Sequence, residues 1–278
     1  MPETIYRYHG YECEPDFEWK PNYVGRAPRQ TPLLIGLELE ITGAGCDDDN
    51  AKAVTTAIGF PCTDSYNLVC SEDGSIGPGF EIISQPSTYE YHTQKYNWKA
   101  GLIKAEELGY ASHDGGKCGL HFHVNRKYFA DAMENPETSI MLLIINNQTW
   151  LRKFSRRQDF RYCAFPYENE PKINAYQFRT DEQPQIQNKL LDYTQFWIDH
   201  YHAVNFNGNA TIEFRFCRGT LRYATFLASM QLIAMICYAV RKFRIEQIAS
   251  VTFSWFKQYA KTMGYKEFLD YTCLYDDK

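Results

Sequence analysis

The chain of 278 residues is long enough to bury a substantial core, and its 44% hydrophobic and 16% aromatic content excludes a disordered protein. Its formal net charge of −5 argues against a general nucleic-acid-binding protein, which would usually carry a basic stripe. Nine cysteines without a Cys-x-x-Cys pair, and a first segment without an apolar targeting core, predict a cytoplasmic protein with reduced thiols.

The first half of the chain combines strand and helix patterns. Residues 1–31 are polar and aromatic with scattered prolines, which predicts an extended arm with at most one short strand. The elements expected next are a strand over 31–41, a helix over about 50–58 capped by an aspartate at 47–49, paired strands over 68–71 and 80–84, one helix over 89–108, and a strand over 119–124.

The second half is predicted to be mainly helical. The expected elements are a helix over 136–154, an irregular loop over 156–187 that covers the site, a strand entered over 196–206, a hairpin turn at 207–209 leading to a strand from 211, a long helix from the N-cap Thr220 to about 248, and a helix over about 254–263. With no internal repeat and no clear linker, one α+β domain over 32–278 is the simplest organisation.

The most apolar segment of the chain lies within the long predicted helix. It covers residues 226–240, about 15 residues, and it contains Gln231. A membrane span needs about 20 apolar residues, so we expect a buried core helix and no membrane partner.

Three short segments place charged or imidazole side chains at alternate positions. They are residues 36–40, 119–124 and 211–216, and the residues between the charged ones are Leu, Ile, Phe or Val. Period-2 alternation is strand geometry, so each pair shares one face of its strand. The pairs are Glu38 with Glu40, His121 with His123, and Glu213 with Arg215. One sheet could therefore carry all six side chains on an open face while its apolar face packs on helices.

Such a cluster predicts a divalent-metal site. Carboxylates that share a site raise each other's pKa unless a cation lies among them. Oxygen and imidazole ligands around an open site suit Mg²⁺ or Mn²⁺. Each pair alone has a simpler interpretation, because the glutamates could face water, the histidines could be hydrogen-bonded within a strand, and Glu213 and Arg215 could form a surface ion pair. The metal site is favoured by the pairs taken together.

These motifs together resemble the glutamine synthetase-like carboxylate–amine ligases, most closely their amidoligase branch. The resemblance covers residues 32 to about 247. The segments that carry it are 36–40, 72–75, 80–86, 119–125, 211–215 and 219–220. It implies a mostly antiparallel curved sheet with helices packed on one face. It also implies an enzyme that uses ATP and two divalent metals to phosphorylate a carboxylate, which an amine then attacks to form an amide.

The resemblance also assigns roles to matching positions. The residues implied to bind one metal are Glu38, His121 and Glu213, and those implied to bind the other are Glu40 and Glu81. His123 matches an ATP-contacting histidine, and Arg215 matches the arginine that neutralises the transferred phosphoryl group. A second carboxylate expected shortly after Glu81 is missing, and no flap for trapping ammonia is recognisable, so ammonia is not the expected amine.

Further candidates come from their place in the chain. Arg218 and Arg222 flank the expected start of the long helix, where free backbone N–H groups favour an anion, so they could bind phosphates or the acceptor carboxylate. Asp73, in a glycine-containing turn, could complete the second metal's shell or take a proton from the amine, and Ser75 of that turn is a candidate for ATP contact. Asn205 could orient substrate, although an ordinary strand-end hydrogen bond would explain it equally well.

The sequence therefore predicts an ATP-dependent ligase acting on a small-molecule or peptide carboxylate and an amine, with nucleic acid expected only as a modified-base substrate. Two other functions fit the same residues. A metal-dependent hydrolase would use the Glu/His cluster to activate water. A nucleotide-binding module that has lost turnover would explain the missing carboxylate.

Overall fold

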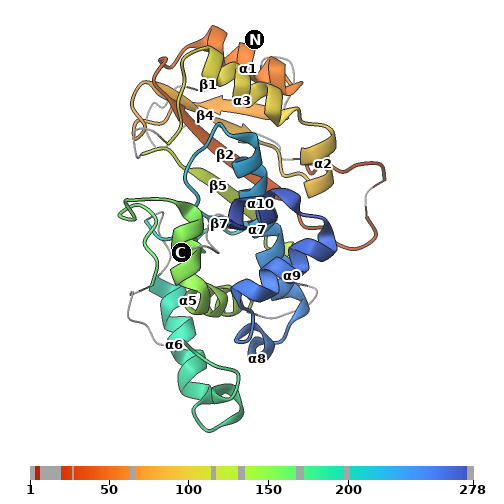
Figure 1. Ribbon diagram of the computed structural model, residues 1–278, viewed down its shortest axis with the longest axis vertical. Helices are drawn as coiled ribbons and strands as arrows, with labels where there is room; N and C mark the ends of the chain where they lie inside the picture. The colour runs from red at the N-terminus through yellow and green to blue at the C-terminus, as the bar shows by residue number, and fades with distance from the viewer. Residues whose placement is uncertain are drawn as a thin grey trace. The chain divides into compact units, whose positions relative to one another are not determined.

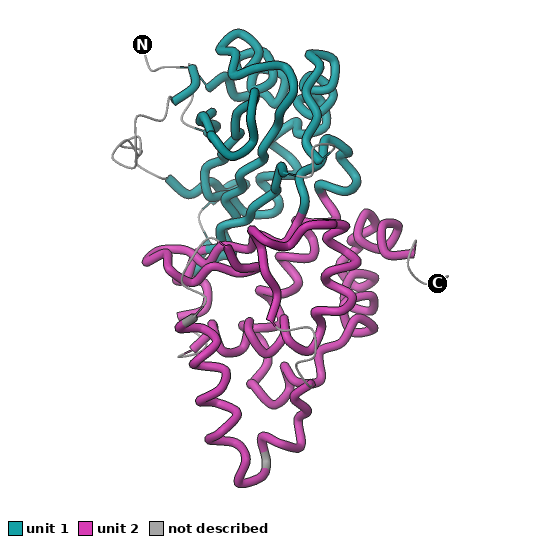
Figure 2. The backbone as a smooth tube through the Cα atoms, turned by 90° about the vertical axis from the view of Figure 1, so that its left-hand side faces the viewer, with its two compact units in different colours: residues 1–124, 218–226 teal, residues 125–217, 227–278 magenta. Residues whose placement is uncertain are grey.

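The computed structural model describes residues 4–6, 20–26, 28–62, 67–113, 117–130, 135–166, 172–196 and 201–273. Contacts divide the chain into two compact units (Figure 2). The first unit contains residues 1–124 and 218–226, and the second contains residues 125–217 and 227–278. The prediction of an arm over 1–31 and one domain over 32–278 stays a prediction.

The first unit is built on strands that pair in the order β1-β3-β4-β2-β5. Their bounds are β1 (Ile5–Tyr6), β2 (Ile35–Thr42), β3 (Leu68–Ser71), β4 (Gly79–Ser84) and β5 (Leu120–Asn125). Short β1 runs parallel to β3, whereas the β3–β4, β4–β2 and β2–β5 pairs are antiparallel. The predicted mostly antiparallel sheet is therefore confirmed for this unit, and β1 is the one strand among the described residues of the arm.

The helices that accompany these strands in the described part of the first unit are α1 (Asp48–Ile58), α2 (Tyr89–Gln94) and α3 (Trp98–Glu107). Asp47 caps α1 as predicted, since its carboxylate accepts the backbone N–H of Asn50 at 2.8 Å. Figure 1 shows α1 and α3 side by side. The single helix predicted over 89–108 is wrong, because the chain breaks before Asn97, whose side chain caps α3.

The described part of the second unit is mainly helical and contains a hairpin of β6 and β7. Its elements are α4 (Lys127–Ala130), α5 (Pro136–Ser155), η1 (Gln177–Arg179), α6 (Gln183–Phe196), β6 (Val204–Asn205), β7 (Thr211–Phe214), α7 (Tyr223–Lys242), α8 (Ile245–Ile248), α9 (Phe253–Met263) and α10 (Lys266–Cys273). The first turn of α7 belongs to the first unit. The predicted helices at 136–154 and 254–263 and the hairpin after Asn205 are confirmed.

Several predictions for the second half are wrong. The loop expected over 156–187 contains η1, and helix α6 begins within it at Gln183. Most of the polar side chains of α6 are exposed, and its buried side chains among the described residues are Ile186 and Leu190. The helix expected over 220–248 begins at Tyr223 and breaks after Lys242. The strand over 196–206 is limited to β6 among the described residues, and α10 was not predicted.

Helix α10 contacts α5 through aromatic rings and contacts α7 through a buried glutamine. Phe154 of α5 stacks on Phe268 of α10 with ring centroids 5.7 Å apart. Gln231 is 1% exposed, and its side-chain oxygen accepts the backbone N–H of Phe268 at 2.8 Å while its amide donates to Glu267 at 2.8 Å. Because both ends of this amide are satisfied, Gln231 joins α7 to α10 without an unpaired buried group.

Helix α7 has the length and apolar composition of a membrane span, the only such case among the described residues. It is longer than the 15-residue segment predicted for it, but 83% of its most apolar window is buried inside the protein. The prediction of a buried core helix is therefore confirmed.

The alternation of β7 can be tested at Phe214, which is fully buried. Phe214→Asp should unfold the protein, because an unpaired carboxylate in an apolar core costs about 4 kcal/mol or more. Urea denaturation followed by circular dichroism measures the loss, and Phe214→Leu is the control that keeps an apolar side chain. A Phe214→Asp variant with an unchanged urea midpoint would show that the face is assigned wrongly.

Candidate metal centre

Strand β2 places two carboxylates on one face of the first unit's sheet. Glu38 is paired with His121 of β5, and Glu40 is paired with Glu81 of β4. Leu39, which lies between them, is fully buried on the other face. The predicted alternation is therefore confirmed in β2, and pairing brings acidic and imidazole groups from three strands together. The face that carries the carboxylates is not open as predicted, since Glu40 is 5% and His121 4% exposed.

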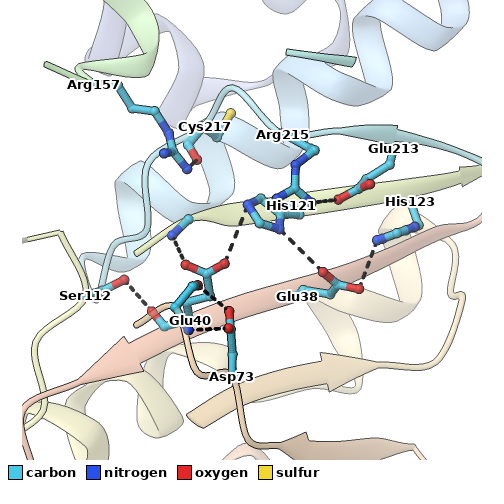
Figure 3. A network of polar contacts seen from close by, with 12 residues as sticks. Glu38, Glu40, Asp73, Ser112, His121, His123, Arg157, Glu213, Arg215 and Cys217 are labelled. Atoms are coloured by element: carbon cyan, nitrogen blue, oxygen red, sulfur yellow. Dashed lines mark hydrogen bonds and ion pairs between the residues drawn. The ribbon is translucent and has the colours of Figure 1, made fainter. Parts of the chain in front are cut away.

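Glu40, Glu81 and Asp73 form the first cluster. One carboxylate oxygen from each lies within 4.8 Å of the other two. Asp73 comes from the turn between β3 and β4, and Figure 3 shows it beside Glu40. Ser75 fixes that carboxylate, because its backbone N–H donates to Oδ1 at 2.7 Å and its hydroxyl donates to Oδ2 at 2.8 Å.

The electrostatics of this cluster favour a cation. Burial raises the pKa of Glu81 well above its usual range, and the neighbouring carboxylates Glu38, Glu40 and Asp73 raise it further. Three carboxylates that face one another in this way offer the oxygen donors that Mg²⁺ and Mn²⁺ prefer. The residues therefore fit a divalent metal, and Asp73 provides the carboxylate that the sequence lacks shortly after Glu81.

Glu40 is held in place by backbone contacts that the sequence did not reveal. The backbone N–H of Gly119 donates to Glu40 Oε2 at 2.5 Å, and the Ser112 hydroxyl donates to the Glu40 carbonyl at 2.7 Å. Gly219 packs against both, since a Cβ there would lie 2.1 Å from Ser112 Oγ and 3.0 Å from the Gly119 carbonyl oxygen. The Gly219 of the family-like motif thus supports the position of Glu40.

Glu38 lies between two imidazoles. His123 Nε2 is 3.0 Å from Glu38 Oε1, and His121 Nδ1 is 3.4 Å from Glu38 Oε2 (Figure 3). The other nitrogen of His121 lies 3.7 Å from Glu40 Oε1, so this ring joins the two carboxylates. Burial alone would raise the pKa of Glu38, but both imidazoles outweigh it and the pKa lies well below its usual range. His123, expected to contact ATP, lies closer to Glu38 than the expected metal ligand His121 does.

The remaining predicted carboxylate belongs to the second unit. Glu213 lies on β7, where Asn205 of the paired β6 donates to Glu213 Oε2 at 3.0 Å and Arg215 forms an ion pair with Glu213 Oε1. Asn205 therefore orients Glu213, and its side-chain oxygen also accepts the backbone N–H of Asn207 at 2.9 Å. That Glu213 shares a metal with Glu38 stays a prediction.

The two arginines proposed for an anion differ in their surroundings. Arg218 is half-buried, and its Nε has no hydrogen-bond partner among the described residues. Arg222 is exposed, and its carbonyl accepts the N–H of Phe226 in the first turn of α7. Thr220 is therefore not the N-cap of the helix; its hydroxyl instead accepts the backbone N–H of Arg222 at 3.1 Å.

Comparison with known proteins adds no family. No family model matches the chain, and no curated protein matches it. The roles taken from the amidoligase resemblance therefore stay predictions, and the candidate metal centre stands on its geometry.

Opposite pKa shifts at Glu81 and Glu38 predict opposite effects on stability in metal-free buffer. The raised pKa of Glu81 means that its ionised form destabilises the fold as pH rises through that pKa, so Glu81→Gln should melt at a higher temperature at pH 8. The lowered pKa of Glu38 means that its ionised form stabilises the fold above the unfolded-state pKa, so Glu38→Gln should melt at a lower temperature.

The Glu81 difference should shrink as pH falls from 8 toward the unfolded-state pKa of about 4, whereas the Glu38 difference should persist to about pH 4 and be lost only below it. Thermal denaturation in EDTA from about pH 3 to 8 measures both differences. Shifts of the same sign at pH 8 would contradict the proposed electrostatics.

Gly219→Ala tests the support of Glu40. The added methyl group must displace Ser112 and Gly119, so we expect a loss of about 1–3 kcal/mol in stability and roughly tenfold weaker Mn²⁺ binding. Gly74→Ala is the matched control, because it adds a methyl group beside Asp73 where nothing lies within 4 Å. Urea denaturation and Mn²⁺ titration by electron paramagnetic resonance measure both effects. Equal Mn²⁺ affinity in the two variants would show that Gly219 does not support the metal centre.

Proposed function

We propose that the protein is an ATP-dependent carboxylate–amine ligase with a divalent metal held by Glu40, Asp73 and Glu81. The observation that carries the proposal is the approach of three carboxylates from β2, β4 and the turn between β3 and β4 to within 4.8 Å. The raised pKa of Glu81 supports it, because burial and the neighbouring carboxylates disfavour its ionised form and a bound cation would offset them.

The chemistry of amide formation explains why such a cluster would be needed. A carboxylate is a poor electrophile because it is anionic and would have to expel oxide, and phosphorylation removes both obstacles. Phosphoryl transfer between anions requires positive charge at the transferring group, which a bound Mg²⁺ or Mn²⁺ would supply. The part of Glu40, Glu81 and Asp73 is to hold that charge in a fixed position.

Asp73 fits the role of a metal donor better than that of the base for the amine. Both of its oxygens already accept hydrogen bonds from Ser75, which fixes the carboxylate toward Glu40 and Glu81. A general base must instead be within reach of the attacking amine. We therefore assign Asp73 to the metal and Ser75 to the positioning of Asp73, in place of the contact with ATP that the sequence suggested for Ser75.

The third carboxylate also weakens the idea of an inactive nucleotide-binding module. That idea depended on the carboxylate missing after Glu81, and Asp73 supplies one from a different segment. A metal held by three carboxylates would be equally suited to a hydrolase that activates water. The requirement for ATP and for two organic substrates distinguishes these functions.

Asp73→Asn tests the metal centre and the activity together. It should weaken Mn²⁺ binding at least tenfold and abolish ADP release, because it removes one of three anionic donors. Electron paramagnetic resonance measures free Mn²⁺, and a coupled assay measures ADP with paired carboxylates and amines drawn from amino acids, peptides, polyamines and modified nucleobases. Glu90→Gln is the control, since this exposed glutamate of α2 lies outside the cluster.

Each outcome of this assay separates one function from the others. ADP release by the wild type that requires both a carboxylate and an amine supports the ligase. Product formation without ATP identifies a hydrolase. Binding of metal and nucleotide without turnover for any substrate pair supports the binding module. If Asp73→Asn leaves Mn²⁺ binding unchanged, the assignment of the metal to this cluster is wrong.

A further inference from the structure

The short strand β1 lies at the edge of the sheet beside β3, the strand that leads into the turn carrying Asp73. Ile5 is paired with Cys70 and Tyr6 with Ser71, in parallel register. Ile5 is 1% exposed, so a buried apolar side chain docks β1 in addition to its backbone pairing. This edge strand is therefore part of the packed core of the first unit.

The last hydrogen bond of this edge reaches beyond β3 into the turn. The backbone N–H of Glu72 donates to the Tyr6 carbonyl at 2.9 Å. Glu72 directly precedes Asp73, whereas the pairing of β3 with β4 ends one residue earlier, at Ser71. Strand β1 therefore extends the support of the chain to the residue next to the proposed metal donor.

The far side of the same turn is held by β2. The Thr42 hydroxyl donates to the Ile76 carbonyl at 2.8 Å, and Ile76 is 3% exposed. Asp73 thus lies in a short segment that is fixed at Glu72 by β1 and at Ile76 by β2. A segment held at both ends presents its carboxylate in one place, and loss of either contact would let it move.

We propose that β1 positions Asp73 for the metal and that Ile5 is the residue that docks β1. Ser75 cannot do this alone, because it belongs to the same turn as Asp73 and would move with it. A contact from outside the turn is needed to keep Asp73 beside Glu40 and Glu81. Ile5 is thus a positioning residue for the metal centre proposed above, on which its role depends.

Ile5→Asp tests this role, because a charge at this buried position should release β1 from the sheet. We expect Mn²⁺ binding to weaken about tenfold, as for other residues that hold a metal ligand in place. Ile5→Val keeps an apolar side chain and should bind Mn²⁺ as the wild type does. Leu102→Ala is the control for stability, since it removes buried atoms from α3, whose residues are not among the three metal donors. It should lower the urea midpoint but leave Mn²⁺ affinity, measured by electron paramagnetic resonance, unchanged.

A double-mutant cycle distinguishes positioning from a general loss of structure. Ile5→Asp should weaken Mn²⁺ binding in the wild type but not in Asp73→Asn, where the positioned carboxylate is already absent. An equal loss in both backgrounds would overturn the positioning role. If Asp73→Asn weakens Mn²⁺ binding and Ile5→Asp does not, the role of Ile5 is wrong and the metal centre stands. If Asp73→Asn has no effect, the metal centre and the role of Ile5 are both wrong.

Hydrogen–deuterium exchange provides a second readout that needs no metal. In Ile5→Ala, a milder change, exchange at Glu72 should become several-fold faster because its N–H loses the Tyr6 carbonyl, while exchange in α3 should stay unchanged. Unchanged exchange at Glu72 would overturn the docking role of Ile5. If Ile5→Asp does not fold, Ile5→Ala replaces it in the double-mutant cycle, with the same outcomes deciding.

Discussion

The repulsion among carboxylates that the sheet forces onto one face is the constraint on which the site depends. Pairing of β2 with β4 places Glu40 opposite Glu81, and the turn before β4 brings Asp73 to them. Glu40 and Glu81 cannot separate without breaking the strand pairing, because a shift of one residue would also turn Leu39 out of the core. Burial of the hydrophobic face therefore fixes the strand register, and the register fixes the positions of the charged side chains.

The carboxylates Glu38 and Glu81 share this face of the sheet but differ in the groups that surround them. Glu38 has two imidazoles within 3.4 Å, and its pKa lies well below the usual range. Glu81 faces carboxylates, and its pKa lies well above that range. Glu38 is offset by two imidazoles, whereas the carboxylates around Glu81 face one imidazole, that of His121, and only at Glu40 among the described ion pairs. This difference is the physical reason for placing the metal at Glu40, Asp73 and Glu81.

The faces of the strands could be predicted from the sequence, but the contacts between distant segments could not. Alternation alone assigned Glu38 and Glu40 to one side of β2, because a strand has a fixed period of two. The contact of Asp73 with Glu40 depends on the conformation of a turn, and the support of Glu40 by Gly119 depends on a backbone N–H that no side-chain pattern records. Helix α6 was missed for a related reason, since its two buried apolar residues give too weak a period.

The fixed position of Asp73 connects the stability of the protein to its proposed function. Ser75 holds both oxygens of Asp73, so the cluster is assembled before any ligand binds. Preassembly removes the need to gather charges during binding, but it leaves their repulsion in the metal-free fold. A cation that binds only the folded state would relieve that repulsion and stabilise the fold by mass action. Replacing Glu81 by a neutral residue should therefore stabilise the metal-free fold and remove the stabilisation that a bound metal adds. A purely structural cluster of ion pairs would not show both effects.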